Sequence, residues 1–532
     1  MVSRIFAAVT AALILAVSSA PAHAEWHKAR SKHFIVYADT SEAELRKRTE
    51  RLERFDALMR LLFKVEETVP VTVYMLPSMS DVQELANNRN VAGFYSASAQ
   101  LAYGFVPQSL SFYAPGFTAE SISMHEYAHH MLLGGTDRYI PSWATEGLAE
   151  LFMTAKLGDD GSITIGAPNP SRSQSMFRGS RWSVKDMLTS DDRKIGRDEV
   201  LQRYSRGWVM VHYLWMSGER PGQYSEFIRL LNESGDALAS GKEAFGDLGK
   251  LNSELNAYLR KSNFPASTFS AEQLGTSTDI AIEPLTDGEI AIIQYRMKSL
   301  LGVTEETAPK LANEARPVGA RFPNDPAVQR AMAEIEYDAK QYGAADAAAD
   351  LALAADPNNV MAMVYKGRVA TRKAMEDNLA EDWDAARQWF LKANRADPNH
   401  PLPFVLFYDS YLAEGGVAPE SAVGGLYRAA VLMPQDLSLR ARASIELIRS
   451  GDIKRARSVL APAAFSPHAA QDNPMRKLIE EIEKGSDKDA LLAFIDEEKL
   501  SKLFNDFLGA EAAKELEEKR DGEKKDEDEK AA

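Results

Sequence analysis

The chain has 532 residues, enough for about two to four domains, and its 45% hydrophobic and 26% charged residues are typical of a globular protein. Its 62 lysines and arginines against 77 aspartates and glutamates give a net charge of −15, which argues against binding to nucleic acid or to an anionic membrane surface. The absence of cysteine excludes disulfides, cysteine nucleophiles and thiolate metal sites.

Residues 1–24 have the pattern of a secretory signal peptide. Arg4 gives a positive start, residues 5–17 form an apolar run of 13, and Ala22-His23-Ala24 offers a cleavage point. The alternative is an uncleaved membrane anchor, but a span needs about 20 apolar residues and this run is shorter. We therefore expect an exported protein, periplasmic or secreted, with no membrane span after signal cleavage.

Two pairs of a strand and a helix follow the signal. Residues 33–38 form a β-rich run, and apolar side chains recur at helical spacing in the segment that begins at Ser41. Residues 71–76 form a second β-rich run, and a helix starts at 81–85. We expect these elements to build the N-terminal α/β part of the first domain, over residues 25–117.

Two further β-like stretches, 92–95 and 101–106, lead into helices that begin near Thr118. We place a helical part of the same domain at residues 118–265. After it, a stretch rich in Ser, Thr and Gly predicts a linker over residues 266–286.

The pattern His125-Glu126-x-x-His129 carries the chemistry of this helical part. Two histidines four residues apart on a helix lie one turn apart on one face, and their ring nitrogens can bind one zinc ion. Glu126 then lies beside the metal, where its carboxylate can take a proton from a metal-activated water and deliver it to a leaving nitrogen. The alternative is a chance occurrence of the pattern.

A zinc site needs a third protein ligand and one open position. The histidine that metzincins carry six residues further on is absent, because Gly135 stands there. A second helix, capped by Ser142, is expected to return antiparallel to the first and to bring Glu146 to the metal. Glu150, one turn later, is expected to accept a hydrogen bond from a ligand histidine. Exposure to solvent is the alternative for either glutamate.

The spacing of this pattern to Trp143-x-x-Glu146-Gly147 resembles the gluzincin clan of zinc metallopeptidases and is similar to the aminopeptidase N family. The resemblance implies a zincin-like α+β catalytic domain and a zinc cofactor held by the two histidines and Glu146. In that family a later helix carries Tyr-x-Lys-Gly, whose tyrosine stabilises the oxyanion. Tyr204-Ser205-Arg206-Gly207 matches it apart from the arginine. A core role for Tyr204 is the alternative.

One departure from that family bears on specificity. Aminopeptidases of the family carry a Gly-Ala-Met-Glu-Asn-like strand that grips the substrate amine, whereas residues 93–104 of this chain contain no acidic residue. The sequence therefore favours an endopeptidase, or a hydrolase that acts on some other amide, over an aminopeptidase. The segment at 101–105 is expected to be an edge strand on which an extended peptide could pair.

Two further histidines are not expected to bind the metal. His130 points about 100° away from the ligand histidines on the same helix, which favours a surface or packing role. His212 lies eight residues after Tyr204 and could approach the cleft, but a core histidine with an internal partner is favoured.

The second half of the chain repeats itself. Four prolines mark intervals of 34, 41 and 36 residues, and 34 is the tetratricopeptide period: Pro323, Pro357, Pro398 and Pro434. Alanine stands twelve and five positions before each of the last three, where two helices cross closely: Ala345, Ala352, Ala386, Ala393, Ala422 and Ala429. We expect an all-α tetratricopeptide superhelix over residues 287–470, with an irregular helical bundle as the alternative.

The chain is expected to end in terminal helices at residues 471–510 and a charged tail at residues 511–532. The concave surface of a repeat superhelix typically recruits a peptide or a partner protein.

The sequence therefore predicts an exported zinc metallopeptidase that hydrolyses peptide or protein substrates. Its zinc would be held by His125, His129 and Glu146, with Glu126 as proton shuttle and Tyr204 at the oxyanion. A rival interpretation is a periplasmic tetratricopeptide scaffold whose zincin domain is inactive or structural.

Overall fold

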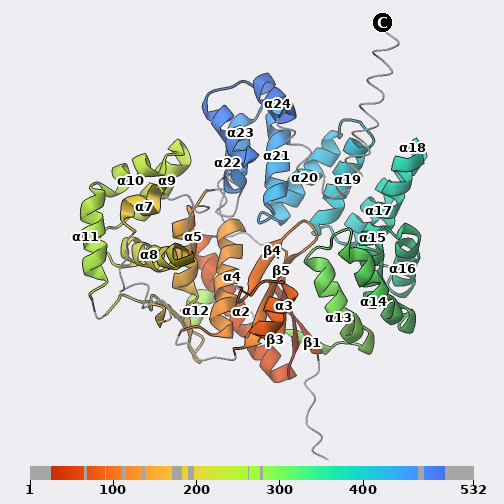
Figure 1. The fold of residues 1–532 in the computed structure, drawn as a ribbon, viewed down its shortest axis with the longest axis horizontal. Coiled ribbons are helices and arrows are strands. Elements are labelled where there is room, and N and C mark those ends of the chain that lie inside the picture. Colours follow the sequence, from red (N-terminus) through yellow and green to blue (C-terminus); the bar gives the residue numbers. More distant parts are fainter. Residues whose placement is uncertain are drawn as a thin grey trace, which may run out of the picture.

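The computed structural model describes residues 26–64, 69–89, 91–110, 116–134, 138–170, 182–189, 197–261, 263–275, 279–377, 379–464 and 473–497. The predicted signal peptide and charged tail lie outside these residues. Within them, a small N-terminal mixed sheet is followed by a mostly helical region (Figure 1). No helix of this described part combines the length and the apolar character needed to cross a membrane.

The larger sheet has six strands in the order β4-β5-β3-β2-β1-β9. Their bounds are β1 (Trp26–Arg30), β2 (Phe34–Asp39), β3 (Val71–Ser78), β4 (Phe94–Ala97), β5 (Ala102–Ser109) and β9 (Ala281–Pro284). The pairs β2–β3 and β3–β5 are parallel, and the remaining pairs are antiparallel. The strands predicted at 33–38 and 71–76 are the two at the centre of this order.

The expected edge strand is wrong. Residues 101–105 fall largely in β5, which is hydrogen-bonded to β3 on one side and to β4 on the other. The edge of the sheet is β4, which follows Gly93 and pairs only with β5 among the described strands. Strand order depends on pairing between distant segments, which a local pattern does not contain.

Two helices connect the strands: α2 (Glu42–Phe63) and α3 (Met79–Leu85). The Ser41 side chain caps α2 by accepting the backbone N–H of Glu44, which satisfies one of the unpaired donors of the first turn. The apolar stripe of α2 packs on one face of the sheet together with the helix that carries the two histidines. The other face contacts Ile293 and Met297 of a later helix.

The helical part that carries the motif lies beside this sheet. Its helices are α4 (Ala119–Gly134), α5 (Ser142–Phe152), α7 (Val184–Thr189), α8 (Arg197–Met216), α9 (Gln223–Ser234), α10 (Ala237–Phe245) and α11 (Leu248–Tyr258). Ser142 does not cap α5 as predicted. Pro141 is the N-cap residue and Ser142 is the first residue of the helix, because the fixed backbone of proline already sets an extended entry.

The segment predicted as a linker forms regular structure. It contains β8 (Ser267–Phe269), α12 (Ala271–Leu274) and β9. β8 pairs with β7 (Ile163–Ile165), which also pairs with β6 (Lys156–Leu157) in a small three-stranded sheet. β9 pairs with β1 at the far edge of the large sheet. Residues 267–284 therefore bind the end of the helical part back to both sheets.

The rest of the described chain is helical. Its helices are α13 (Asp287–Leu300), α14 (Thr307–Arg321), α15 (Pro326–Asp338), α16 (Tyr342–Ala355), α17 (Val360–Asp377), α18 (Ala380–Ala396), α19 (Pro401–Ala413), α20 (Glu420–Leu432), α21 (Leu437–Ser450), α22 (Ile453–Ala464), α23 (Pro474–Glu483) and α24 (Lys488–Glu497). The six alanines of the predicted repeat pattern are all fully buried. Figure 1 shows these helices curving around the sheet.

The helical array contacts the sheet and α4 directly. Asp436 accepts the backbone N–H of Ala99 at 2.9 Å, and Gln100 donates to Glu334 at 2.7 Å. Tyr103 donates its hydroxyl to the backbone oxygen of Leu300 at 2.7 Å. The turn between β4 and β5, together with the start of β5, is therefore attached to α13, to α15 and to the N-cap residue of α21.

Candidate metal centre

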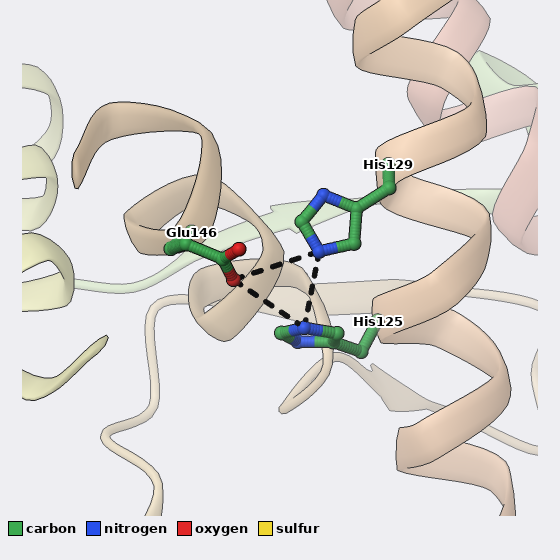
Figure 2. A group of neighbouring side chains, drawn as sticks. All are labelled: His125, His129 and Glu146. Atoms are coloured by element: carbon green, nitrogen blue, oxygen red, sulfur yellow. Dashed lines mark hydrogen bonds and ion pairs between the residues drawn. The ribbon is translucent and has the colours of Figure 1, made fainter. Parts of the chain in front are cut away.

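Three side chains from two helices converge on one point (Figure 2). His125 and His129 lie one turn apart on α4, and Glu146 of α5 points toward both of them. The two Nε2 atoms are 3.2 Å apart. Oε2 of Glu146 lies 3.6 Å from Nε2 of His125 and 3.5 Å from Nε2 of His129. Helical spacing predicted the two histidines on one face, and Glu146 was expected from a second helix that returns to them.

These distances fit a tetrahedral zinc ion. Ligand atoms about 2.0 to 2.1 Å from a tetrahedral metal lie about 3.3 Å from one another, close to the three separations in this group. Oε2 of Glu146 is buried and has no hydrogen-bond partner within the described part of the chain, as expected for an atom that serves as a metal ligand. Two imidazoles and one carboxylate are a donor set suited to zinc.

The electrostatics of the group also suit a cation. Burial lowers the pKa of His125, and the charge of His129 lowers it further. Burial also works to lower the pKa of His129, but the carboxylate of Glu146 outweighs it and raises that pKa to about 9. Burial works against the charged form of Glu146, yet His129 and His125 bring its pKa down to about 2. The triad thus holds a protonated His129 beside the ionised carboxylate of Glu146. A metal cation could take the place of that proton.

The two motif glycines lie where α5 and α8 cross. A Cβ on Gly147 would lie 2.5 Å from the backbone of Gly207, and a Cβ on Gly207 would lie 2.4 Å from the backbone oxygen of Trp143. Only glycine at both positions allows this close approach. The crossing brings the start of α8 beside Glu146.

Tyr204 and Arg206 of α8 have different surroundings. The ring of Tyr204 lies 6.1 Å from the ring of His125, so this half-buried tyrosine borders the triad. Arg206 points the other way and donates to Asn256 at 3.0 Å and to Asn252 at 2.7 Å. Arg206, which stands where the aminopeptidase N family has lysine, therefore attaches α8 to α11.

Glu150 lies one turn beyond Glu146 and is fully buried. It accepts a hydrogen bond from Nδ2 of Asn169 at 3.2 Å. Nδ1 of His125 is buried and has no hydrogen-bond partner among the described residues, so the expected bond from a ligand histidine to Glu150 does not form at that ring. The charge of Glu150 nevertheless contributes to the raised pKa of His129.

Glu126, the expected proton shuttle, is half-buried next to the triad. A Cβ on Gly93 would lie 3.6 Å from Cγ of Glu126 and 2.7 Å from the side chain of Ile122. The start of the edge strand β4 therefore lies against Glu126, and glycine is needed there because any side chain would clash.

Two histidines outside the triad have internal partners, as interpreted from the sequence. His130 is fully buried, with the hydroxyl of Tyr95 at 2.5 Å and the amide of Gln435 at 3.2 Å. His212 accepts the Tyr258 hydroxyl at 2.9 Å, and its other nitrogen lies 3.0 Å from the backbone oxygen of Gly166.

Three residues near the triad were not singled out from the sequence. Arg203 is buried and its charge helps to lower the pKa of Glu146, Asn169 bonds to Glu150, and Gly93 packs on Glu126. Arg203 stands directly before the Tyr-x-x-Gly motif, which is a local signal. Asn169 and Gly93 reach the site through long-range packing and leave no such signal.

A second group of potential metal ligands consists of His33, Glu53 and Asp56. Nδ1 of His33 lies 2.8 Å from Glu53 and 3.0 Å from Asp56, while Asp56 also pairs with Arg60 at 2.9 Å and accepts the Tyr127 hydroxyl at 2.6 Å. Burial lowers the pKa of His33, but the two carboxylates outweigh it and raise the pKa to about 9. This group is an ion-paired cluster that already holds its cations.

Residues 119–237 match a protein family described as a protein of unknown function (DUF1570). The matched segment includes α4, α5 and α8, and hence the triad, Glu126 and Tyr204. No curated protein matches the chain.

Proposed function

We propose that the protein is a zinc-dependent metallopeptidase of the gluzincin type, with an appended tetratricopeptide region. The observation that carries this proposal is the triad of His125, His129 and Glu146, whose ligand atoms have tetrahedral separations. The side chains of the two histidines are 14% and 17% exposed, so the site borders solvent on one side. A structural zinc site is closed by a fourth protein ligand, whereas a catalytic one stays open.

The surrounding residues have roles in peptide hydrolysis under this proposal. When bound, zinc would act as a Lewis acid on the scissile carbonyl and on the attacking water. Glu126 takes the proton of that water and passes it to the leaving nitrogen. Tyr204 donates its hydroxyl to the oxygen that gains negative charge.

The substrate is an extended peptide or protein segment under this proposal. β4 is the edge of the sheet and starts against Glu126, so a peptide that pairs with β4 passes the proton shuttle. Residues 93–104 contain no carboxylate that could grip a substrate amine, which favours an endopeptidase over an aminopeptidase.

The repeat region is proposed to recruit a substrate or a protein partner, and the protein is proposed to act in the periplasm or outside the cell. The repeat intervals of the prolines and the buried alanines support the tetratricopeptide assignment. Residues 1–24 support export by their sequence.

The test compares the wild type with Glu126→Gln, which removes the base and keeps the size of the side chain. We expect one zinc per chain in both proteins by elemental analysis. We expect cleavage of a mixed peptide library by the wild type, and a loss of turnover of about a hundredfold or more in the variant. Metal bound without cleavage in either protein would favour the scaffold interpretation, and protein without zinc would refute the site.

A further inference from the structure

A cavity of about 510 Å³ lies between the β4–β5 hairpin and the helices α13, α15 and α17. The hairpin contributes Ser96, Ser98 and Gln100 to its lining. Tyr95, which directly precedes Ser96 on β4, points the opposite way and reaches His130 on α4. The cavity is therefore on the far side of the sheet from the metal triad, but it shares the edge strand with it.

The cavity lining carries three cations, Lys340, Arg368 and Arg372, and two acids, Glu334 and Asp338. Burial, followed by the charge of Glu334, raises the pKa of Asp338 to about 7. Lys340 pairs at 2.8 Å with Glu305, which lies outside the lining. Set beside that pair, the lining has two arginines, Arg368 and Arg372, and two acids, Glu334 and Asp338.

Each carboxylate oxygen of Glu334 has a neighbouring polar side chain. Arg330 lies 3.6 Å from one carboxylate oxygen, and Gln100 donates to the other at 2.7 Å. Its negative charge is thus partly balanced from outside the cavity lining. An anion is therefore a better occupant than a cation.

Tyrosine rings hold the two arginines in place. The guanidinium of Arg368 lies 5.1 Å from the ring centre of Tyr337 and 5.4 Å from that of Tyr365, and the guanidinium of Arg372 lies 5.4 Å from that of Tyr342. A guanidinium fixed by its face keeps its N–H groups in a defined plane, and this planar fork matches the two oxygens of a carboxylate.

The edge strand connects the cavity to the metal triad. Gly93 packs against Glu126, and Ser98 lines the cavity five residues later. β4 (Phe94–Ala97) lies between these two positions. A bound peptide extended at about 3.3 Å per residue covers the five steps in roughly 17 Å. A peptide that pairs with β4 and has its scissile bond near Glu126 therefore reaches the cavity about five residues away.

We propose that this cavity binds a carboxylate of the peptide substrate, either an acidic side chain or the C-terminal carboxylate, about five residues from the scissile bond. The proposal rests on the peptidase function proposed above and names the substrate class of that site: extended peptides with a carboxylate at this distance.

The first experiment profiles cleavage. A degenerate peptide library, with free or amidated C-termini, is digested with the wild type, Arg372→Gln, Ser98→Asp and the control Arg428→Gln. Arg428 is an exposed arginine of the repeat region that donates to Asn399, away from the cavity. Ser98→Asp places a repelling charge from the hairpin side, and it keeps the test valid should Arg372→Gln be unstable.

In the wild type and the control we expect Asp and Glu to be enriched four to six residues from the cleaved bond. In both cavity variants kcat/KM for acidic peptides should fall about tenfold, with neutral peptides unchanged. If the C-terminal carboxylate is the ligand, amidation alone removes the preference. Cavity variants that keep the wild-type preference would overturn the proposal.

The second experiment measures binding without turnover. A labelled Glu-rich decapeptide and its Gln counterpart are titrated against zinc-loaded Glu126→Gln protein by fluorescence anisotropy. Tighter binding of the acidic peptide, lost in the double variant Glu126→Gln/Arg372→Gln, supports the cavity as a carboxylate site. Absence of cleavage by the wild type would refute only the peptidase function and not this binding result. Equal binding of both peptides overturns the cavity assignment.

Discussion

Tyr204 is the residue whose proposed catalytic role is easiest to separate from a structural one. Its ring borders that of His125, but it is not a member of the triad. We expect Tyr204→Phe to lower kcat by about a hundredfold to a thousandfold and to leave KM nearly unchanged, because the lost hydroxyl would act only on the transition state. Steady-state kinetics on a cleaved peptide would measure this.

The matched control for Tyr204→Phe is Tyr213→Phe on the same helix. Tyr213 donates to Glu254 at 3.1 Å, away from the triad. Zinc content and melting temperature should stay at wild-type values in Tyr204→Phe. An unchanged kcat there, or an equal loss in the control, would assign Tyr204 to the core.

His33 makes stability depend on pH. Its pKa is about 9 in the folded protein, above the ordinary value of 6.5 in the unfolded chain. Its contribution is therefore fully present below pH 6.5 and is lost as the pH rises through 9, and it amounts to up to about 3 kcal/mol. Denaturant unfolding between pH 6 and 9.5 should show this loss.

The variant His33→Gln should flatten that alkaline slope. His400→Gln is the control, because burial lowers the pKa of His400 to about 4 and this residue does not titrate in the same range. A slope that persists in His33→Gln would show that another group causes it.

Which residues form the candidate site could be predicted where the signal is local. The helical spacing of His125 and His129 places both on one face of α4, and the second helix brings Glu146 to them. Gly93 and Asn169 could not be predicted, because each reaches the site through contacts with segments at least 19 residues away.

Among the elements, the crossing of α5 and α8 determines whether Glu146 and Tyr204 lie together. We expect Gly147→Ala to cost about 1 to 3 kcal/mol of unfolding free energy, because its Cβ would clash with the backbone of Gly207 at 2.5 Å. Zinc affinity should fall with stability, since the helices must move apart. Denaturant unfolding and a zinc titration measure the two effects.

Gly424→Ala is the matched control for that helix crossing. Gly424 also lies within a helix, α20, but a Cβ there meets nothing within 4 Å. Alanine should therefore raise stability by up to about 1 kcal/mol through its helix propensity. Similar losses of unfolding free energy in Gly147→Ala and Gly424→Ala would show that the close approach of α5 and α8 is not the cause.

Elements set by their own residues were predicted well, and elements set by distant partners were not. The β-rich run at 71–76 lies in β3, and the apolar side chains at helical spacing after Ser41 lie in α2. The strand at 281–284 forms because it pairs with β1, about 250 residues earlier, and its own sequence reads as a linker. The same reason explains why β4 rather than β5 is the edge.

At the scale of the whole molecule, the sheet and the helical array share their contacts. Ile293 and Met297 of α13 pack on the sheet with Tyr37 and Tyr74, and Asp436 accepts the N–H of Ala99 while it caps α21. Neither part keeps its buried surface without the other. The expected domain boundary at residues 266–286 therefore does not predict independent folding.

We expect the described parts to unfold in one cooperative transition. Calorimetry should give one peak, and Asp436→Ala should shift the whole of it to lower temperature, because the loss of a buried acceptor leaves the N–H of Ala99 without its partner. Asp397→Ala is the control, since Asp397 caps the turn between α18 and α19 by accepting the N–H of Asn399 at 2.9 Å. Its effect should be smaller, about 1 kcal/mol or less. Two separate peaks, with Asp436→Ala moving only one of them, would show that the two parts fold independently. The cavity, which is lined by both the β4–β5 hairpin and the helical array, would then lie between two parts that move separately.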